Sequence, residues 1–277
     1  ETLKIFIKKP NSSCLQERGL VMITFFGAIM REKIIAGNWK MHGTAKTAAK
    51  LAADLANSSG DYPELIVFPP YVCIPAVVNE LLAVRNIAIG AQNISHHSEG
   101  AYTGEISGKM LSDIGCSHVL VGHSERRTYC SESNELVAEK FAAAKRSGLV
   151  PILCVGETLE QRQQGRELQV IKSQLDAVVD VVGLEVVCDA IVAYEPVWAV
   201  GTGETATPEQ AQQVHSFIRA ELGSGGTDTQ ILYGGSINAD NAAALFAQPD
   251  LDGGLVGGAS LEAEHFINIA QQIVEQK

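Results

Sequence analysis

The amino-acid sequence predicts a single α/β domain that folds as a closed (β/α)8 barrel, and three observations support this prediction. Eight short runs of apolar, largely β-branched residues follow one another from Lys33 onward. The runs are continuous rather than alternating in polarity, which is typical of parallel strands that are buried on both faces. Longer segments with helix signals separate them, and barrels of this kind often reach about 250 residues as one domain.

In chain order, the predicted strands are KIIAGNW (33–39), LIVFPP (65–70), IAIGAQN (87–93), HVLVGHS (118–124), LVPILCVGE (149–157), AIVAYEP (190–196), ILYGGS (231–236) and GLVGGAS (254–260). The clearest helix starts after Thr207, an N-cap residue, with Pro208 at its first position and Gln210 completing a capping box. Segments 134–148 and 159–179 are also amphipathic. Because no linker or repeat divides the chain, we predict one domain.

That domain is predicted to span residues 31–277, because the first 30 residues differ from the rest. Four basic residues precede an uncharged run, GLVMITFFGAIM (19–30). The run is shorter than the roughly 20 residues that span a membrane, and no small-x-small cleavage site follows it. We therefore predict that residues 1–30 are an N-terminal extension, not a signal peptide or a membrane anchor.

Composition narrows the range of functions. The net charge of −11 argues against nucleic acid and anionic membranes as partners, so an anionic substrate would have to be attracted locally. The six cysteines are scattered without a Cys-x-x-Cys pair, which indicates reduced thiols in a cytoplasmic protein. His96 and His97 are neighbours rather than an i, i+4 pair, so no metal site is expected there.

Ionisable and polar residues follow several predicted strands at their carboxyl ends. In a barrel the loops after the strands share one rim, where the site is expected. Each of these residues alone has an ordinary explanation, as a surface lysine, a buried histidine or a salt-bridge partner. Their coincidence on one rim predicts a site made of Asn38, Lys40, His123, Ser124, Glu125 and Glu195.

Glycines extend this rim after the last two strands. Gly234 to Ser236 follow the seventh strand, and Gly257 and Gly258 follow the eighth. Either set is compatible with a tight turn. Two sets at adjacent strand ends, one of them with a serine, favour a phosphate cradle built from backbone N–H groups.

A dinucleotide site is the main competing interpretation of the glycine pattern. Gly201, Gly203 and Ala206 match G-x-G-x-x-A, but the following helix starts only after Thr207. The acid near the required spacing, Glu221, lies within that helix rather than at the end of the next strand. Residues 104–109 likewise lack the spacing of a P-loop. Neither nucleotide motif is therefore expected to function.

Six motifs match one known family in order along the chain. AGNWKMHGT, VGHSERR, CVGETLEQR, AYEPVWAVGTG, LYGGSIN and GLVGGASL resemble the signatures of the triosephosphate isomerase family, over essentially residues 33–277. The resemblance implies interconversion of dihydroxyacetone phosphate and D-glyceraldehyde 3-phosphate through an enediol(ate). It implies no cofactor and no metal, and a cytoplasmic homodimer of glycolysis and gluconeogenesis.

The resemblance also implies a role for each site residue. Glu195 would be the base that moves a proton between two substrate carbons, and His123 would be a neutral electrophile at the start of a helical turn whose amides disfavour an imidazolium. Lys40 would offset substrate charge, Glu125 would hold its ammonium group, and Ser124 would hold Glu195 before the substrate arrives. The implied phosphate- and substrate-binding residues are Asn38, Lys40, Gly201, Ser236, Gly257 and Gly258.

Residues 196–206 are implied to form a mobile lid. PVW is the stiff hinge joined to Glu195, AVGTG is the tip that folds over the phosphate, and ETA lies near the second hinge. Closure would exclude water and protect the intermediate. Glu204 stands where the family commonly has a lysine, beside the second hinge, and its charge adds repulsion toward a dianionic substrate. No loss of activity is expected, and the effect on lid kinetics stays open.

Loop 91–107, AQNISHHSEGAYTGEIS, is polar and rich in glycine. The resemblance implies that it inserts into a partner subunit near Asn38 and Lys40, with Thr103 at its tip. Its ordinary interpretation is a mobile surface loop.

Two alternative functions are disfavoured by particular residues. A Schiff-base aldolase needs a lysine at the end of an interior strand, and the sixth strand ends in Glu195 instead. A phosphate-binding protein without activity would be expected to lose one of Lys40, His123 and Glu195, and all three are present.

Overall fold

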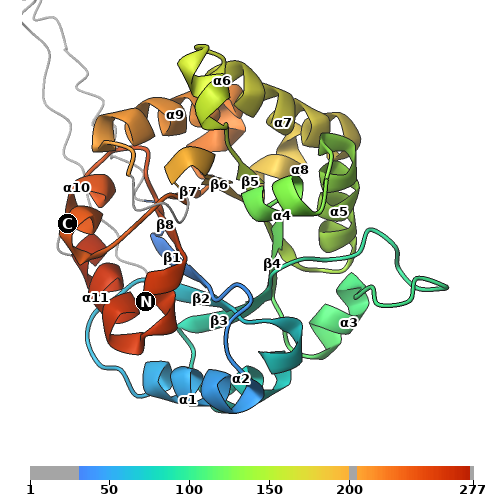
Figure 1. Cartoon of the computed structure of the whole chain (residues 1–277), viewed down its shortest axis with the longest axis vertical. Coiled ribbons are helices and arrows are strands. Elements are labelled where there is room, and N and C mark those ends of the chain that lie inside the picture. Colours follow the sequence, from blue (N-terminus) through green and yellow to red (C-terminus); the bar gives the residue numbers. More distant parts are fainter. Residues whose placement is uncertain (1–30, 200–204, 275–277) are drawn as a thin grey trace, which may run out of the picture.

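A computed structural model describes residues 31–199 and 205–274, in which eight parallel strands close into a barrel surrounded by helices (Figure 1). Neighbouring strands pair in sequence order, and β1 completes the ring by pairing with β8. The strands are β1 (Ile34–Asn38), β2 (Glu64–Phe68), β3 (Ile87–Ala91), β4 (His118–Val121), β5 (Val150–Val155), β6 (Ile191–Tyr194), β7 (Ile231–Tyr233) and β8 (Gly253–Val256). The predicted (β/α)8 fold is confirmed.

The helices lie on the outside of the barrel, in the segments that follow the strands (Figure 1). They are α1 (Ala45–Ala56), α2 (Ile74–Leu81), α3 (Gly108–Asp113), α4 (Ser124–Tyr129), α5 (Asn134–Arg146), α6 (Leu159–Gln163), α7 (Glu167–Val182), α8 (Leu184–Cys188), α9 (Pro208–Glu221), α10 (Ala239–Phe246) and α11 (Ala263–Val274). The capping box predicted at Thr207 is present. The single helix predicted over 159–179 is instead α6 and α7, because Gly165 between them has a φ of +65°, in the left-handed region.

The strands are buried on both faces, as their continuous apolar runs predict. One set of alternate side chains fills the barrel interior, and the other packs against the helices. In β6, Ile191 and Ala193 belong to the interior set. Glu195 follows two residues later and continues the same row, so the end of this strand directs a carboxylate toward the barrel mouth.

Two predicted segments lie outside the described residues. These are the extension at residues 1–30 and residues 200–204 of the predicted lid, which include Gly201 and Glu204. Among the described helices, none combines the length and the apolar character that a membrane span needs.

A buried histidine on α9 predicts acid sensitivity. His215 is completely buried, and burial lowers its pKa from 6.5 to about 4; Arg219 acts in the same direction, while the Asp250 carbonyl and the charges of Asp250 and Asp252 oppose the shift. The folded state therefore keeps His215 neutral at pH values where the unfolded chain protonates it. The free energy of unfolding is expected to decrease as the pH falls from about 6.5 to about 4, by up to about 3 kcal/mol from this residue.

Urea unfolding at pH 7, 6, 5 and 4 measures this effect, with His215→Phe as the comparison. Burial also lowers the pKa of His118 to about 4, so part of the decrease should persist in the variant. An equal loss of unfolding free energy in both proteins would exclude His215 as a source.

Candidate active site

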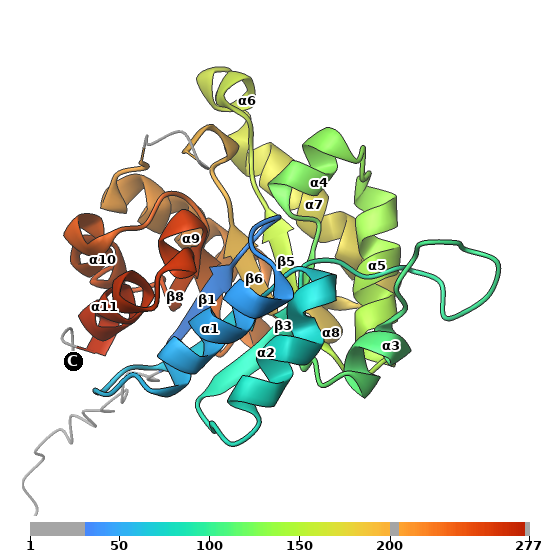
Figure 2. The same ribbon diagram turned by 60° about the horizontal axis from the view of Figure 1, so that its bottom comes forward.

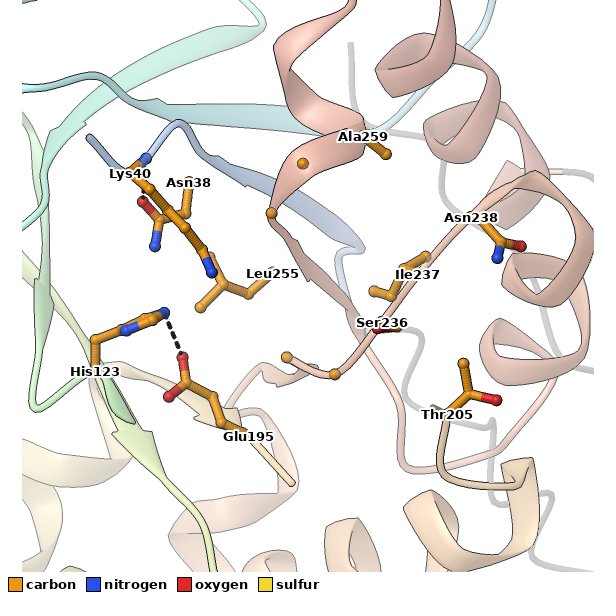
Figure 3. Close-up of a pocket in the computed structure, with 14 residues that line it drawn as sticks. Asn38, Lys40, His123, Glu195, Thr205, Ser236, Ile237, Asn238, Leu255 and Ala259 are labelled. Atoms are coloured by element: carbon orange, nitrogen blue, oxygen red, sulfur yellow. Dashed lines mark hydrogen bonds and ion pairs between the residues drawn. The ribbon is translucent and has the colours of Figure 1, made fainter. Parts of the chain in front are cut away.

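A cavity of about 290 Å³ opens at the carboxyl ends of the strands (Figure 3). Nine of the residues predicted from the sequence line it: Asn38, Lys40, His123, Glu195, Gly234, Gly235, Ser236, Gly257 and Gly258. Ser124 and Glu125 contact these residues. Gly201 lies outside the described residues.

Glu195 and His123 lie side by side at one edge of this cavity, with their polar atoms directed toward each other (Figure 3). Glu195 is 1% exposed, and its Oε2 accepts a hydrogen bond of 2.7 Å from the backbone N–H of Ser124. Its Oε1 lies 3.1 Å from Nε2 of His123, but this buried oxygen has no hydrogen-bond partner among the described residues. One carboxylate oxygen is thus anchored and the other is close to an imidazole without being hydrogen-bonded to it.

The position of His123 determines which of its nitrogens carries the proton. His123 is the N-cap of α4, and its Nδ1 accepts a 3.2 Å hydrogen bond from the backbone N–H of Glu125. A nitrogen that accepts a hydrogen bond carries no proton, so in the neutral ring the proton is on Nε2. Nε2–H is the group that faces Glu195, so the ring presents a donor at the cavity.

Lys40 has a left-handed backbone, with a φ of +51°, and several groups hold it there. Its N–H donates to Oδ1 of Asn38 at 3.0 Å, and Nε2 of Gln92 donates to the Lys40 and Phe68 carbonyls, both at 2.8 Å. Its ammonium group lies 2.6 Å from Oε1 of Glu125. Gln92 was missed by the sequence analysis, although it directly follows β3 at the same level as the other site residues.

The glycines after β7 and β8 leave space at the cavity wall. A Cβ at Gly234 would lie 2.8 Å from Cγ of Glu195, so only glycine fits beside this carboxylate. A Cβ at Gly257 would lie 3.5 Å from Cε of Lys40, and one at Gly258 would meet nothing within 4 Å. No side chain therefore covers the backbone of Gly257 and Gly258 on the side of the cavity. An anion site built from backbone N–H groups requires such open backbone.

Hydrogen bonds hold the segment after Glu195 on both sides of the part that the structure does not describe, at Trp198 and at Ala206. Glu157 is fully buried, and its Oε1 accepts hydrogen bonds from Nε1 of Trp198 at 2.9 Å and from the Tyr194 hydroxyl at 3.1 Å. At the other end, the N–H of Ala206 donates to the Tyr233 hydroxyl at 3.2 Å. The sequence analysis did not single out Glu157 or either tyrosine, because their contacts join residues far apart in the chain.

No cluster of three or more histidine, cysteine, aspartate or glutamate side chains is placed to hold a metal ion in the part of the chain that the structure describes. The ionisable groups of the cavity are Lys40, His123 and Glu195. This set can move protons and stabilise an anion, which is acid–base chemistry.

Comparisons with known proteins agree with this geometry. The family model of triosephosphate isomerase matches residues 33–273. The triosephosphate isomerase of Halorhodospira halophila (strain DSM 244 / SL1) is 53% identical over 251 residues, which are 89% of this chain and 100% of the relative. Those of Xanthomonas axonopodis pv. citri (strain 306) and Nitrosomonas eutropha (strain DSM 101675 / C91 / Nm57) are 51% identical over 247 residues, covering 87% and 86% of this chain and 98% and 97% of the relatives. The chain therefore belongs to the triosephosphate isomerase family of enzymes.

Proposed function

We propose that this isomerase interconverts dihydroxyacetone phosphate and D-glyceraldehyde 3-phosphate, with Glu195 as the base and neutral His123 as the electrophile. The observation that carries the proposal is the approach of these two side chains to 3.1 Å in a cavity that Lys40 also lines. The reaction moves protons between adjacent carbons and oxygens without net oxidation, so acid–base side chains suffice and no cofactor is proposed.

Glu195 must move before it acts as a base. A substrate atom needs about 3 Å to each catalytic group, and the 3.1 Å gap between Glu195 and His123 leaves no room for one. The Ser124 N–H holds the carboxylate in this resting position. Because Pro196 to Trp198 follow Glu195 directly, lid closure would carry the carboxylate off the Ser124 amide and over the substrate carbons.

His123 would serve both substrate oxygens in turn. Its Nε2–H would donate to the carbonyl oxygen as negative charge develops there, and the ring could then exchange this proton with the neighbouring oxygen. Nδ1 is engaged by the Glu125 N–H. This hydrogen bond supports a neutral ring, because Nδ1 needs a free lone pair to accept from the Glu125 N–H.

Lys40, Ser236 and the uncovered backbone of Gly257 and Gly258 would bind the substrate phosphate. The chain carries a net charge of −11, so a dianion needs these local donors. A lid formed by residues 196–206 would close over the phosphate and keep the intermediate from expelling it. The hydrogen bond from the Ser236 hydroxyl to the Ala199 carbonyl, 2.9 Å long, supports contact between the phosphate loop and the lid.

We further propose a homodimer through loop 91–107. This loop projects from the barrel between β3 and α3 (Figure 2), and residues 98–105 are exposed. Two large apolar side chains close in sequence to site residues are also exposed. Met41 is 95% exposed and Tyr129 is 82% exposed. A second copy that covers them would bury this apolar surface. Sedimentation velocity of the wild type and of Thr103→Arg tests this, because the arginine at the loop tip should shift the protein toward monomer.

A cytoplasmic location is also proposed. The five cysteines in the described residues are all free thiols, which suits a reducing compartment. No nucleic-acid or membrane partner is proposed, given the negative net charge.

The test of the proposed function is an assay of the purified protein with each triose phosphate, coupled to a dehydrogenase specific for the other. Turnover is expected in both directions. In D₂O the product should also carry deuterium at the carbon that receives the proton, because a carboxylic acid exchanges its proton with solvent. Absence of turnover in both directions would refute the proposal.

Replacing Gln92 tests whether the strained backbone of Lys40 matters for binding. Gln92→Leu leaves the Lys40 and Phe68 carbonyls without this donor and frees the Lys40 backbone. Because a buried unpaired polar group costs about 1–3 kcal/mol, we expect KM to rise about tenfold with a smaller loss of kcat. Steady-state kinetics measure this; an unchanged KM would mean that the contacts with Asn38 and Glu125 suffice to hold Lys40 in place.

A further inference from the structure

Strands β4 and β5 stop pairing beside the candidate site. The last pair in their register is Val121 with Leu153. Continued pairing would next place Gly122 opposite Cys154. Gly122 instead has a φ of +74°, in the left-handed region, and turns the chain out of the sheet just before His123. The backbone carbonyls of Gly122 and Cys154 therefore need a donor from outside this pair of strands.

The side chain of Arg127 on α4 supplies this donor and bridges the two strand ends. Its Nε donates to the Gly122 carbonyl at 2.8 Å, and its Nη2 donates to the Cys154 carbonyl at 3.2 Å. Its Nη1 donates at 2.7 Å to Oδ1 of Asn134, the first residue of α5. One planar guanidinium thus joins the ends of both strands to the start of a helix. Figure 1 shows α4 and α5 beside these strand ends.

These three contacts of Arg127 are made to neutral oxygens. The neighbouring Arg126 differs, because its Nε lies 2.6 Å from the Glu132 carboxylate. The guanidinium of Arg127 also packs on bare backbone, since a Cβ at Gly122 would lie 2.9 Å from Nη2. Arg127 therefore fits the course of the backbone at this turn, which pairing with a charge alone would not require.

The turn that Arg127 holds carries two groups of the candidate site. Fixing the Gly122 carbonyl fixes the plane of the peptide that leads to Cα of His123, because the peptide group is rigid. The next backbone N–H, that of Ser124, donates to Oε2 of Glu195 at 2.7 Å. The position of this one peptide plane therefore affects both the imidazole and the amide that anchors the carboxylate.

We infer that Arg127 is a positioning residue for His123 and for the Ser124 amide that anchors Glu195. Its guanidinium takes the place of the strand pairing that ends at Val121 and fastens the turn to β5. The imidazole and the carboxylate thereby keep their relative placement although the turn has left the sheet. This role of Arg127 rests on the proposed function, because it concerns the two groups that would move protons on a triose phosphate.

Arg127→Lys tests the arrangement of N–H groups without changing the charge. A lysine ammonium keeps the positive charge but cannot reproduce the planar fork that serves three acceptors. Arg219→Lys is the matched control, because Arg219 on α9 also donates to backbone carbonyls, including those of Thr229 and Asp250. These two residues precede β7 and β8 and lie at the amino ends of the strands, away from the residues that line the cavity.

The first readout is the split between kcat and KM. Arg127→Lys is expected to lower kcat by about tenfold to 10²-fold, since a displacement of about 1 Å can cost about 10²-fold in rate. KM should change by less than about threefold, because the phosphate-binding residues after β7 and β8 are untouched. Arg219→Lys should lower Tm and leave kcat within about twofold of the wild type, as expected for a distant site.

The second readout is hydrogen–deuterium exchange at the Ser124 and Glu125 amides, followed by NMR, which needs no turnover. Arg127→Lys is expected to accelerate exchange at both amides about fivefold, the factor that corresponds to losing one ordinary hydrogen bond. The amides of β2, far from both arginines, are the internal reference for global stability. Arg219→Lys should leave exchange at Ser124 and Glu125 unchanged relative to this reference.

Asn134→Ala is a milder variant that keeps Arg127 itself. It removes the acceptor of Nη1 and leaves both carbonyl contacts, so it answers the question even if Arg127→Lys does not fold. Exchange at Ser124 and Glu125 should rise about threefold relative to β2, and kcat should fall by a similar factor, since the guanidinium is held less firmly.

Arg127 has no positioning role if Arg127→Lys and Arg219→Lys lower kcat by the same factor, because Arg127 then contributes only to stability. The role is also excluded if exchange at Ser124 and Glu125 follows that of β2 in every variant, since the turn is then held without the guanidinium. Absence of isomerase activity in the wild type would refute the proposed function instead, and exchange at these two amides would still report whether Arg127 holds the turn.

Discussion

Glu195→Gln is expected to lower kcat by about 10³- to 10⁴-fold, the upper part of the range for loss of general acid–base catalysis. The carboxamide has the shape of the carboxylate, and its oxygen still accepts from the Ser124 N–H. KM should therefore change by less than about threefold, since the side chain remains in place and only its basicity is lost. Steady-state kinetics on D-glyceraldehyde 3-phosphate, after removal of any contaminating host isomerase, measure both constants.

Glu195→Asp is the control that separates basicity from position. It keeps a carboxylate but withdraws it by about one methylene, and a displacement of about 1 Å can cost about 10²-fold in rate. The aspartate variant should therefore lie between the wild type and the glutamine variant. A glutamine variant within tenfold of the wild type would remove Glu195 from the role of base.

Lys40→Met is expected to lower kcat/KM by about 10²- to 10³-fold, the effect of removing a charge that stabilises a developing anion in a partly buried site. Lys40 is the only lysine or arginine among the described residues that line the cavity. Its loss also leaves Glu125, whose carboxylate lies 2.6 Å from the Lys40 ammonium group, to repel the phosphate. Both effects oppose binding of a dianion, so KM should rise as kcat falls.

Lys109→Met provides the matched control for charge. It makes the same change to the net charge at an exposed position on α3, away from the residues that line the cavity. Its kcat/KM should stay within about twofold of the wild type at 0.15 M salt, where distant exposed charges are screened. Equal losses in the two variants would mean that Lys40 acts only through the overall field of the protein.

The fold could be predicted because its signals are local. Buried parallel strands read as continuous apolar runs, and Thr207, Pro208 and Gln210 mark one helix start within four residues. The residues at the strand ends were also predictable, since closing the barrel brings every such end to one rim. The break between α6 and α7 was missed because Gly165 alone does not distinguish a tolerated helix glycine from one with positive φ.

The supporting contacts of the site could not be predicted in the same way. Glu157 meets Trp198 across 41 positions, and Gln92 meets Lys40 across 52. No pattern within a window of one helix or strand contains both members of such a pair. The anchor of Glu195 is likewise a backbone N–H, that of Ser124, and any residue except proline would supply that group.

The N-cap position of His123 links the placement of its imidazole to that of the Glu195 carboxylate. Nδ1 of His123 caps the first turn of α4, and the backbone N–H of the next residue, Ser124, donates to Glu195. Any substitution that changes the course of this turn would therefore displace the imidazole and the carboxylate together, so their relative placement depends on one short piece of backbone.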